Sequence, residues 1–248
     1  MMPMIIGFVQ TKGGTGKSTL ALNTAFSKAA ARHHDAIALV ELDHQGTLRN
    51  WWEEREEMGY GSGKVSFHHI SSTQKEVFQE GIKAITQHND LIIMDIPGEG
   101  TGRLHTRFAC AFCDVAVIPM RQSTNDESAF LDNLYPIIKD IVLAVPEKRG
   151  RFHVLPVFTH PRAGLKKIYA HFKEVLPPYV TCLKTVYPAR AVYENFNRRG
   201  LNLNEYAALV ASNRKYRQQV EKAVEDVETI AKTLIDIGRK KDDNAEGK

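Results

Sequence analysis

The sequence contains little cysteine and no long uninterrupted apolar run. Its three cysteines, Cys110, Cys113 and Cys182, are too few for a disulfide scaffold, which favours a reducing, cytoplasmic compartment. No apolar stretch reaches the roughly 18 residues that a membrane-spanning helix requires. Residues 1–4 show no charged segment leading to a cleavage site. We therefore expect a protein that is neither exported nor membrane-spanning.

Repeats and low-complexity blocks are also missing, and the composition is that of a folded chain. Hydrophobic residues make up 43% of the 248 residues and charged residues 25%, which argues against wholesale disorder. The formal charge is only +4, from 33 basic and 29 acidic residues. The length suits one large domain, and we predict a single domain over residues 1–238 with a polar tail at 239–248.

Short apolar runs alternate with helical periodicity along most of the chain. Six runs rich in strand-forming residues are Met4–Gln10, Ala36–Leu42, Val65–Ile70, Leu91–Ile96, Val115–Met120 and Phe152–Thr159. Between them, Gly16–Arg32 and Thr73–His88 predict helices. Continuous apolar runs separated by helices are typical of parallel strands buried on both faces. The sequence therefore predicts a doubly wound, mostly parallel α/β sheet flanked by helices.

A glycine-rich segment, QTKGGTGKST, leads from the first strand into the first helix at residues 10–19. Glycines let backbone N–H groups approach phosphate oxygens, and the helix N-terminus adds donors and partial positive charge. In such a loop Lys17 reaches the β- and γ-phosphates and the Ser18 hydroxyl lies on Mg²⁺. The predicted phosphate-binding residues are Gly13, Gly14, Thr15, Gly16, Lys17, Ser18 and Thr19.

The loop departs from the usual G-x-x-x-x-G-K-[ST] pattern at two places. Thr11 stands where that pattern has its first glycine, and Lys12 is an additional cation. Two lysines so close together repel each other unless an anion lies between them, and a bound triphosphate supplies that anion.

Two carboxylates end predicted strands near this loop. Asp43 lies 26 residues after Lys17, where a carboxylate can orient an attacking water; the alternative is a helix N-cap. Asp95 follows Leu91–Met94 and is predicted to face Mg²⁺, through water; the alternative is a solvated strand-end aspartate.

KGGTGKST resembles the deviant Walker A motif of the ParA/MinD group of ATPases. The resemblance extends to ALVELDHQGTLRNW, DLIIMDIPGEG, VAVIPMRQS and residues 188–206, and is closest to the small plasmid-partition ParA proteins. It implies a P-loop NTPase that uses ATP and Mg²⁺ and forms an ATP-bound homodimer. Lys12 would be the signature lysine that reaches the partner subunit's phosphates, and Asp43 the residue that orients water.

The resemblance also shows where this chain differs from the family. The family's D-x-D-P-Q pattern reads Glu41-Leu42-Asp43-His44-Gln45, so a longer carboxylate replaces the first aspartate and histidine the proline. The segment 97–102 after Asp95 is predicted to sense the γ-phosphate. ATP follows from the resemblance, because the sequence carries no base-specific pattern.

Positive charge is concentrated near the C-terminus. Residues 184–222 contain eight basic and three acidic side chains, giving +5, while the rest of the chain sums to −1. Such a patch suits sequence-independent contacts to a DNA backbone; the alternative is a solvated basic helix face. The resemblance implies nonspecific DNA binding by the dimer, nucleoid association, and slow hydrolysis stimulated by a ParB-like or adaptor protein. By region, the DNA-binding candidates are Arg198, Arg199, Arg214, Lys215 and Arg217.

Two alternatives come from other members of the same group. A MinD-like membrane-positioning ATPase would use a C-terminal amphipathic helix, but the acidic polar face after Val220 would be repelled by anionic lipid. We expect that helix to pack on the core. An iron–sulfur carrier would use a pair such as Cys110 and Cys113, but a lone C-x-x-C favours buried thiols. Trp51 and Trp52 are predicted to lie in core or switch packing rather than to stack on a base.

Overall fold

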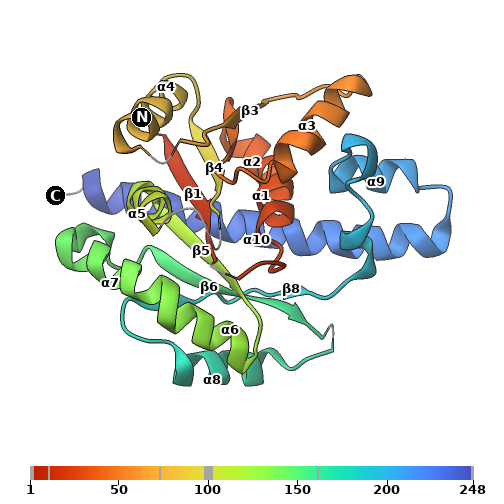
Figure 1. Ribbon diagram of the computed structural model, residues 1–248. Coiled ribbons are helices and arrows are strands. Elements are labelled where there is room, and N and C mark those ends of the chain that lie inside the picture. Colours follow the sequence, from red (N-terminus) through yellow and green to blue (C-terminus); the bar gives the residue numbers. More distant parts are fainter. Residues whose placement is uncertain (1–2, 11, 73, 98–102, 161, 247–248) are drawn as a thin grey trace.

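The computed structural model is a parallel β-sheet between two layers of helices (Figure 1). It describes residues 3–10, 12–72, 74–97, 103–160 and 162–246. Over these residues the eight strands lie in the order β3-β2-β4-β1-β5-β6-β7, with β8 also paired to β6. Every pairing in this part of the chain is parallel. The predicted doubly wound α/β sheet is confirmed.

The strands are β1 (Met4–Phe8), β2 (Ile37–Glu41), β3 (Val65–His69), β4 (Leu91–Asp95), β5 (Val115–Met120), β6 (Phe152–Thr159), β7 (Val180–Cys182) and β8 (Tyr187–Pro188). The α-helices are α1 (Lys17–Ala25), α2 (Lys28–His33), α3 (Thr47–Glu57), α4 (Lys75–Thr86), α5 (Arg103–Phe112), α6 (Thr124–Ala129), α7 (Tyr135–Ala144), α8 (Leu165–Val175), α9 (Leu203–Leu209) and α10 (Arg214–Glu246). Shorter helical turns are η1 (Phe130–Leu134), η2 (Pro146–Lys148), η3 (Ala191–Glu194) and η4 (Arg198–Gly200).

The six predicted strands all form, but two local features differ from the prediction. The helix expected over 16–32 is divided, because the Ser27 hydroxyl accepts a hydrogen bond from the Ala30 N–H at 3.0 Å and begins α2 as its N-cap. Strands β7 and β8 were not predicted. They have only three and two residues, too few for a period-2 pattern to be recognised.

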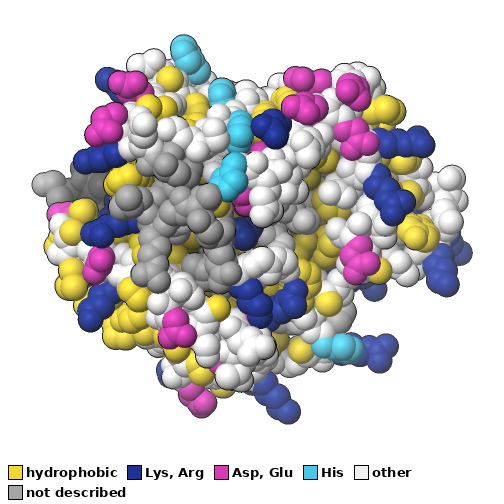
Figure 2. Space-filling model, viewed as in Figure 1, with side chains coloured by type: hydrophobic (Ala, Val, Ile, Leu, Met, Phe, Trp, Pro, Cys, Tyr) yellow, Lys and Arg dark blue, Asp and Glu magenta, His cyan; other side chains and the backbone are white. Residues whose placement is uncertain are grey.

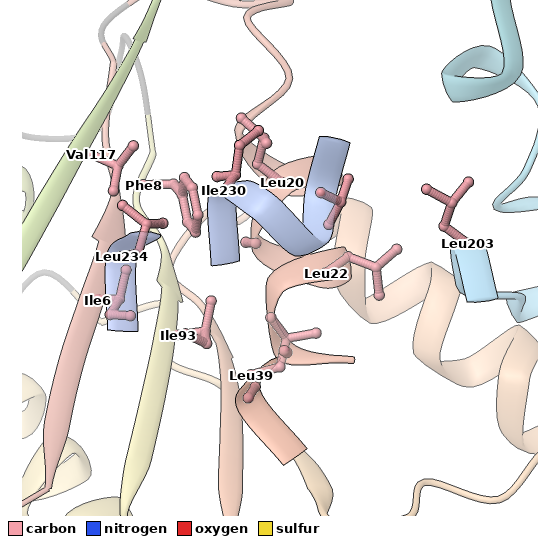
Figure 3. Packing of buried hydrophobic residues seen from close by; sticks show 14 of the residues in the cluster. Ile6, Phe8, Leu20, Leu22, Leu39, Ile93, Val117, Leu203, Ile230 and Leu234 are labelled. Carbon is pink, nitrogen blue, oxygen red and sulfur yellow. The ribbon is translucent and has the colours of Figure 1, made fainter. Parts of the chain in front are cut away.

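Alternate residues of the strands pack into two separate cores. Ile6 belongs to the cluster under α1, α3 and α10, whereas its neighbour Ile5 belongs to the cluster under α4, α5, α7 and α8. Ile230 and Leu234 of α10 belong to the first cluster together with Ile6 (Figure 3). The apolar stripe of α10 therefore packs on the sheet, as predicted.

The long helix α10 crosses one whole face of the molecule and ends at Glu246, beyond residue 238, where the sequence suggested that the domain ends (Figure 1). Among the described residues, no helix is long and apolar enough to cross a membrane.

The parallel register brings the carboxyl ends of β1, β2 and β4 to one edge of the sheet. Asp95, the last residue of β4, is paired with Phe8 on one side and with Glu41 on the other. The segments that leave these strands carry the glycine-rich loop, Asp43 and the residues that follow Asp95. Ligands of doubly wound proteins bind at this edge.

Candidate functional site

The glycine-rich loop lies between β1 and α1 with its backbone in a conformation that suits glycine. Gly14 and Gly16 have φ angles of 71° and 83°, and Gly16 immediately precedes α1. No side chain of the described structure caps the first turn of α1. The Thr15 hydroxyl is buried without a hydrogen-bond partner in this part of the chain. Unpaired donors at a helix N-terminus favour an anionic ligand. Thr11 lies outside the described residues, as do Gly98–Gly102 of the predicted sensing segment.

Asp95 is a deeply buried carboxylate beside the loop, with 2% of its surface exposed. Burial raises its pKa to about 7, although a hydrogen bond with Ser18 and the nearby Lys17 charge act in the opposite direction. Its Oδ1 has no hydrogen-bond partner among the described residues. Mg²⁺ prefers oxygen ligands, and a hydroxyl next to a carboxylate that has one oxygen free of hydrogen bonds supplies such ligands. Ser18 and Asp95 therefore fit the predicted magnesium ion, and Asp95 is not a solvated strand-end residue.

The two carboxylates after β2 have different environments. Both Glu41 oxygens accept backbone N–H groups at the start of α3, from Leu48 at 2.8 Å and Arg49 at 3.0 Å. Burial raises the pKa of Glu41, and these two hydrogen bonds oppose the shift. Asp43 is half-buried, and its Oδ1 accepts only the Gln45 N–H at 3.0 Å in the described structure. Glu41, not Asp43, therefore supplies the acceptors for the α3 N-terminus, which leaves Asp43 free of the N-cap role.

Lys12 is held by a residue that the sequence did not single out. Its Nζ donates to Asp126 Oδ1 at 2.5 Å, and Asp126 Oδ2 accepts the Arg121 N–H at 3.1 Å. Burial alone would raise the pKa of Asp126, but the hydrogen bonds from Lys12 and Arg121 lower it below the ordinary value. Asp126 lies 114 residues from Lys12, so only the fold shows that the two are partners.

A pocket of about 420 Å³ opens beside the loop. Its lining residues are Gly14, Gly16, Thr19, Phe158, Tyr187, Ala189, Arg190, Ala191, Tyr193 and Glu194. The rings of Tyr187 and Tyr193 stack with centroids 4.3 Å apart, and aromatic side chains next to a loop predicted to bind phosphate suit a nucleotide base. The sequence pattern does not assign these aromatic residues to the site, because Phe158 comes from β6, Tyr187 from β8 and Tyr193 from the turn after β8.

The basic residues of the C-terminal region separate into different places. The five DNA-binding candidates are all exposed, in η4 and at the start of α10. Figure 2 shows Lys and Arg side chains along the right-hand edge, where α9 and this end of α10 lie. By contrast, Lys184 lines a pocket between α8 and β7, and Arg190 forms an ion pair with Asp226. The sequence patch of eight cations is therefore not one patch in space.

Arg55 of α3 fixes the turn that carries Arg198 and Arg199. Its side chain is 2% exposed and donates to the Gly200 carbonyl at 2.9 Å and to Glu205 at 2.7 Å. Gly200 has φ 69°, and a Cβ there would lie 2.3 Å from the Arg55 Cα, so this position requires glycine. Helix α3, which begins just after Asp43, is thus packed rigidly against the basic turn.

The remaining predicted features are structural. Cys110 and Cys113 are buried, and burial raises the pKa of Cys110 to about 12 and that of Cys113 well above its ordinary value. Protonated thiols are poor metal ligands, and among the described residues Cys110 and Cys113 do not belong to any group of three or more His, Cys, Asp or Glu side chains that could hold a metal ion. Trp51 is 5% exposed and donates to the Leu201 carbonyl, which confirms core packing.

Comparison with known proteins gives consistent results. The profile of the CobQ/CobB/MinD/ParA nucleotide binding domain matches residues 6–244. A carboxysome distribution protein A from Gloeobacter kilaueensis is 30% identical over 95 residues, which span 38% of this chain and only 39% of that relative.

Two solved structures illustrate the shared fold. The MinD cell division protein of Aquifex aeolicus superposes with a TM-score of 0.63 at 14% identity, covering 94% of this chain and 97% of that one. A Borrelia burgdorferi protein assigned to plasmid partition and bound to AMPPNP superposes with a TM-score of 0.56 at 14% identity. The superposition covers 87% of this chain and 100% of that one.

Proposed function

Because the chain belongs to the CobQ/CobB/MinD/ParA nucleotide-binding domain family, we propose that it is a ParA-like positioning ATPase. It dimerises around ATP and Mg²⁺, binds DNA without sequence preference in that state, and leaves DNA after hydrolysis. A ParB-like or adaptor protein stimulates that hydrolysis. The observation that carries the proposal is that Asp95 Oδ1 is buried without a hydrogen-bond partner among the described residues. This oxygen belongs to the carboxylate that is hydrogen-bonded with Ser18, at the N-terminus of α1, where no side chain caps the helix after the glycine-rich loop.

Each residue of the site has a role that its position supports. The loop amides of residues 13–19 and Lys17 bind the phosphates and offset charge that develops during transfer. Ser18 and Asp95 hold Mg²⁺, which stabilises charge on the phosphoryl oxygens. Asp43, not engaged as the α3 N-cap, orients the attacking water.

Lys12 links this chemistry to dimerisation. In the single chain its Nζ is occupied by Asp126. When a second subunit presents ATP, the phosphates compete with Asp126 for the same ammonium group. When Lys12 exchanges Asp126 for the phosphates of ATP, dimerisation becomes dependent on the triphosphate. A ligand shifts the equilibrium between monomer and dimer only if it binds one of these states more tightly than the other.

The DNA surface is supported by exposure and charge. Arg198, Arg199, Arg214, Lys215 and Arg217 all face solvent, and the first two are fixed to α3 through Arg55. A change at Asp43 can therefore reach the basic turn through one rigid helix. Binding would be sequence-independent and would weaken steeply with salt.

The cargo is proposed from relatives alone. One similar protein is a carboxysome distribution protein and one is assigned to plasmid partition. We propose that this chain positions a plasmid, a chromosome or another cargo across the nucleoid. The membrane-positioning alternative is not favoured, because the apolar face of α10 is occupied by the core.

The test is DNA binding under nucleotide control. Fluorescence anisotropy with a labelled random-sequence duplex should show binding with ATP and Mg²⁺, and little with ADP. Lys17→Ala should abolish both ATP binding and the ATP-dependent DNA binding. Lys83→Ala, an exposed lysine on α4, is the matched control and should behave as the wild type. DNA binding that ignores nucleotide, or ATP-dependent binding to anionic liposomes in place of DNA, would contradict the proposal.

A further inference from the structure

Arg121, the first residue after β5, contacts the glycine-rich loop, and its place in the segment VAVIPMRQS does not predict this contact. Its Nη2 donates to the Gly14 carbonyl at 2.8 Å. Its guanidinium lies over the Phe158 ring, 4.6 Å from the ring centroid. Its own backbone N–H is fixed by Asp126. The exposed side chain is therefore held by two contacts and its backbone by a third, even though it contributes little to the core.

The contact to Gly14 determines the direction of a loop amide. A peptide unit is planar and trans, so its C=O and the following N–H point in opposite directions. When Arg121 holds the Gly14 oxygen, the Thr15 N–H is directed to the other side of the loop. Gly14 has φ 71° and no side chain to limit its rotation, so the loop itself does not impose this direction.

Phe158 holds the guanidinium in place and is itself in a strained conformation. Its φ of 52° lies in the left-handed region, which is uncommon for a bulky residue. Its ring lies beside Gly16, where a Cβ would meet it at an ordinary contact distance of 3.7 Å, and it also lines the pocket beside the loop. Strained backbone of this kind persists where the surrounding structure requires it, and it concentrates at functional sites.

We propose that Arg121, stacked on Phe158, is a positioning residue that fixes the Gly14–Thr15 peptide with its N–H directed at the bound phosphates. This inference rests on the proposed nucleotide-binding role of the loop. Arginine suits the position because its planar group can stack on a ring and donate a hydrogen bond at once, whereas lysine carries only a point charge.

The first test measures the affinity for a fluorescent ATP analogue. Arg121→Met should raise its Kd about tenfold, the scale of one lost charge-assisted hydrogen bond. The melting temperature without nucleotide should stay within about 2 °C, because the side chain is exposed. In steady-state hydrolysis, KM should rise while kcat changes by less than about twofold. The matched control is Arg149→Met, which removes an exposed arginine that lies over Tyr179 at 5.7 Å. This control should leave Kd unchanged.

The conservative variant separates geometry from charge. Arg121→Lys should recover only part of the lost affinity; full recovery would overturn the positioning role. Phe158→Leu should also raise Kd, and adding it to Arg121→Met should give little further loss, because both act on one peptide. Fully additive losses, or an unchanged Kd in Arg121→Met, would overturn the inference while leaving the proposed function intact. A wild-type protein that does not bind ATP would instead overturn the proposed function.

Discussion

The carboxyl-terminal edge of the sheet and the corner formed by η4, α9 and the start of α10 both carry charged residues, but they hold them differently. At the sheet edge the charges are few and deeply placed, such as Asp95 at 2% exposure and Glu41 at 0%. At the corner the candidate cations are exposed, and Arg217 forms an i,i+4 ion pair with Glu221 whose side chains are 55% and 49% exposed. The first arrangement is a site with fixed geometry, and the second is an electrostatic surface.

This difference predicts how each region responds to substitution. A buried group acts through one geometry, so its removal should change binding or catalysis sharply. Exposed cations contribute small increments that salt screens. Four substitutions, from the largest expected effect to the smallest, can break or sharpen this contrast.

Asp43→Ala should have the largest effect. If Asp43 orients the attacking water, kcat for ATP hydrolysis should fall at least about 100-fold while the Kd for ATP is unchanged. Phosphate release and nucleotide titration measure the two quantities. Asp140→Ala, an exposed carboxylate on α7, is the control. Full hydrolysis by the Asp43 variant would remove this residue from the mechanism.

Asp95→Asn should stabilise the nucleotide-free protein at high pH. The pKa of Asp95 is about 7 in the folded state, against 3.8 for an unperturbed aspartate, the value taken for the unfolded chain. Because the folded state holds the proton more tightly, the free energy of unfolding of the wild type falls as the pH rises from about 4 to 7. The variant lacks this loss, and its free energy of unfolding should exceed that of the wild type by about 1–4 kcal/mol at pH 8, with little difference at pH 4.

Urea unfolding at several pH values measures this difference. The same Asp95 variant should lose the dependence of ATP binding on Mg²⁺. A stability difference that is independent of pH would contradict the burial argument.

Asp126→Asn should destabilise the protein modestly. The carboxylate is buried and its pKa is lowered in the folded state, so its stabilising contribution is present at neutral pH and lost as the pH falls through its folded pKa. We expect a loss of about 1–2 kcal/mol at pH 7, reduced because Lys12 is 37% exposed. Thermal melts at neutral and acidic pH test this, and a larger loss at acidic pH would contradict it.

Arg214→Ala should have the smallest effect. Removal of one exposed cation should weaken ATP-dependent DNA binding by a few-fold and lower the salt slope by about one. Hydrolysis without DNA should be unchanged. Complete loss of DNA binding from this single change would show that the corner formed by η4, α9 and the start of α10 is a site with fixed geometry. The contrast between the two regions would then fail.

The sequence predicted the sheet because its strands are buried on both faces and therefore read as continuous apolar runs. The same reasoning placed the glycine-rich loop between β1 and α1, since a strand, a glycine run and a helix follow each other directly. It could not locate β7 and β8, which are too short to show a period. It also assigned the possible N-cap role to Asp43, whereas the longer Glu41 side chain reaches Leu48 and Arg49.

Contacts across the fold had no signal in the sequence. The partner of Lys12 is Asp126, and the partner of the Gly14 carbonyl is Arg121, more than 100 residues away in each case. The eight cations that are neighbours in sequence include Lys184 and Arg190, which face separate pockets. The local sequence pattern indicates periodicity and composition, but it does not indicate which side chains far apart in the sequence contact each other.

The sequence by itself therefore determined the fold class, the place of the glycine-rich loop and the carboxylates that end the strands, because each depends on residues that are neighbours along the chain. Only the tertiary structure decided which oxygen of Asp95 lacks a partner, which residue holds Lys12, and which cations face solvent. The physical reason is that parallel strands gather their carboxyl ends at one edge, and burial there sets the charge state and hydrogen bonding of each group.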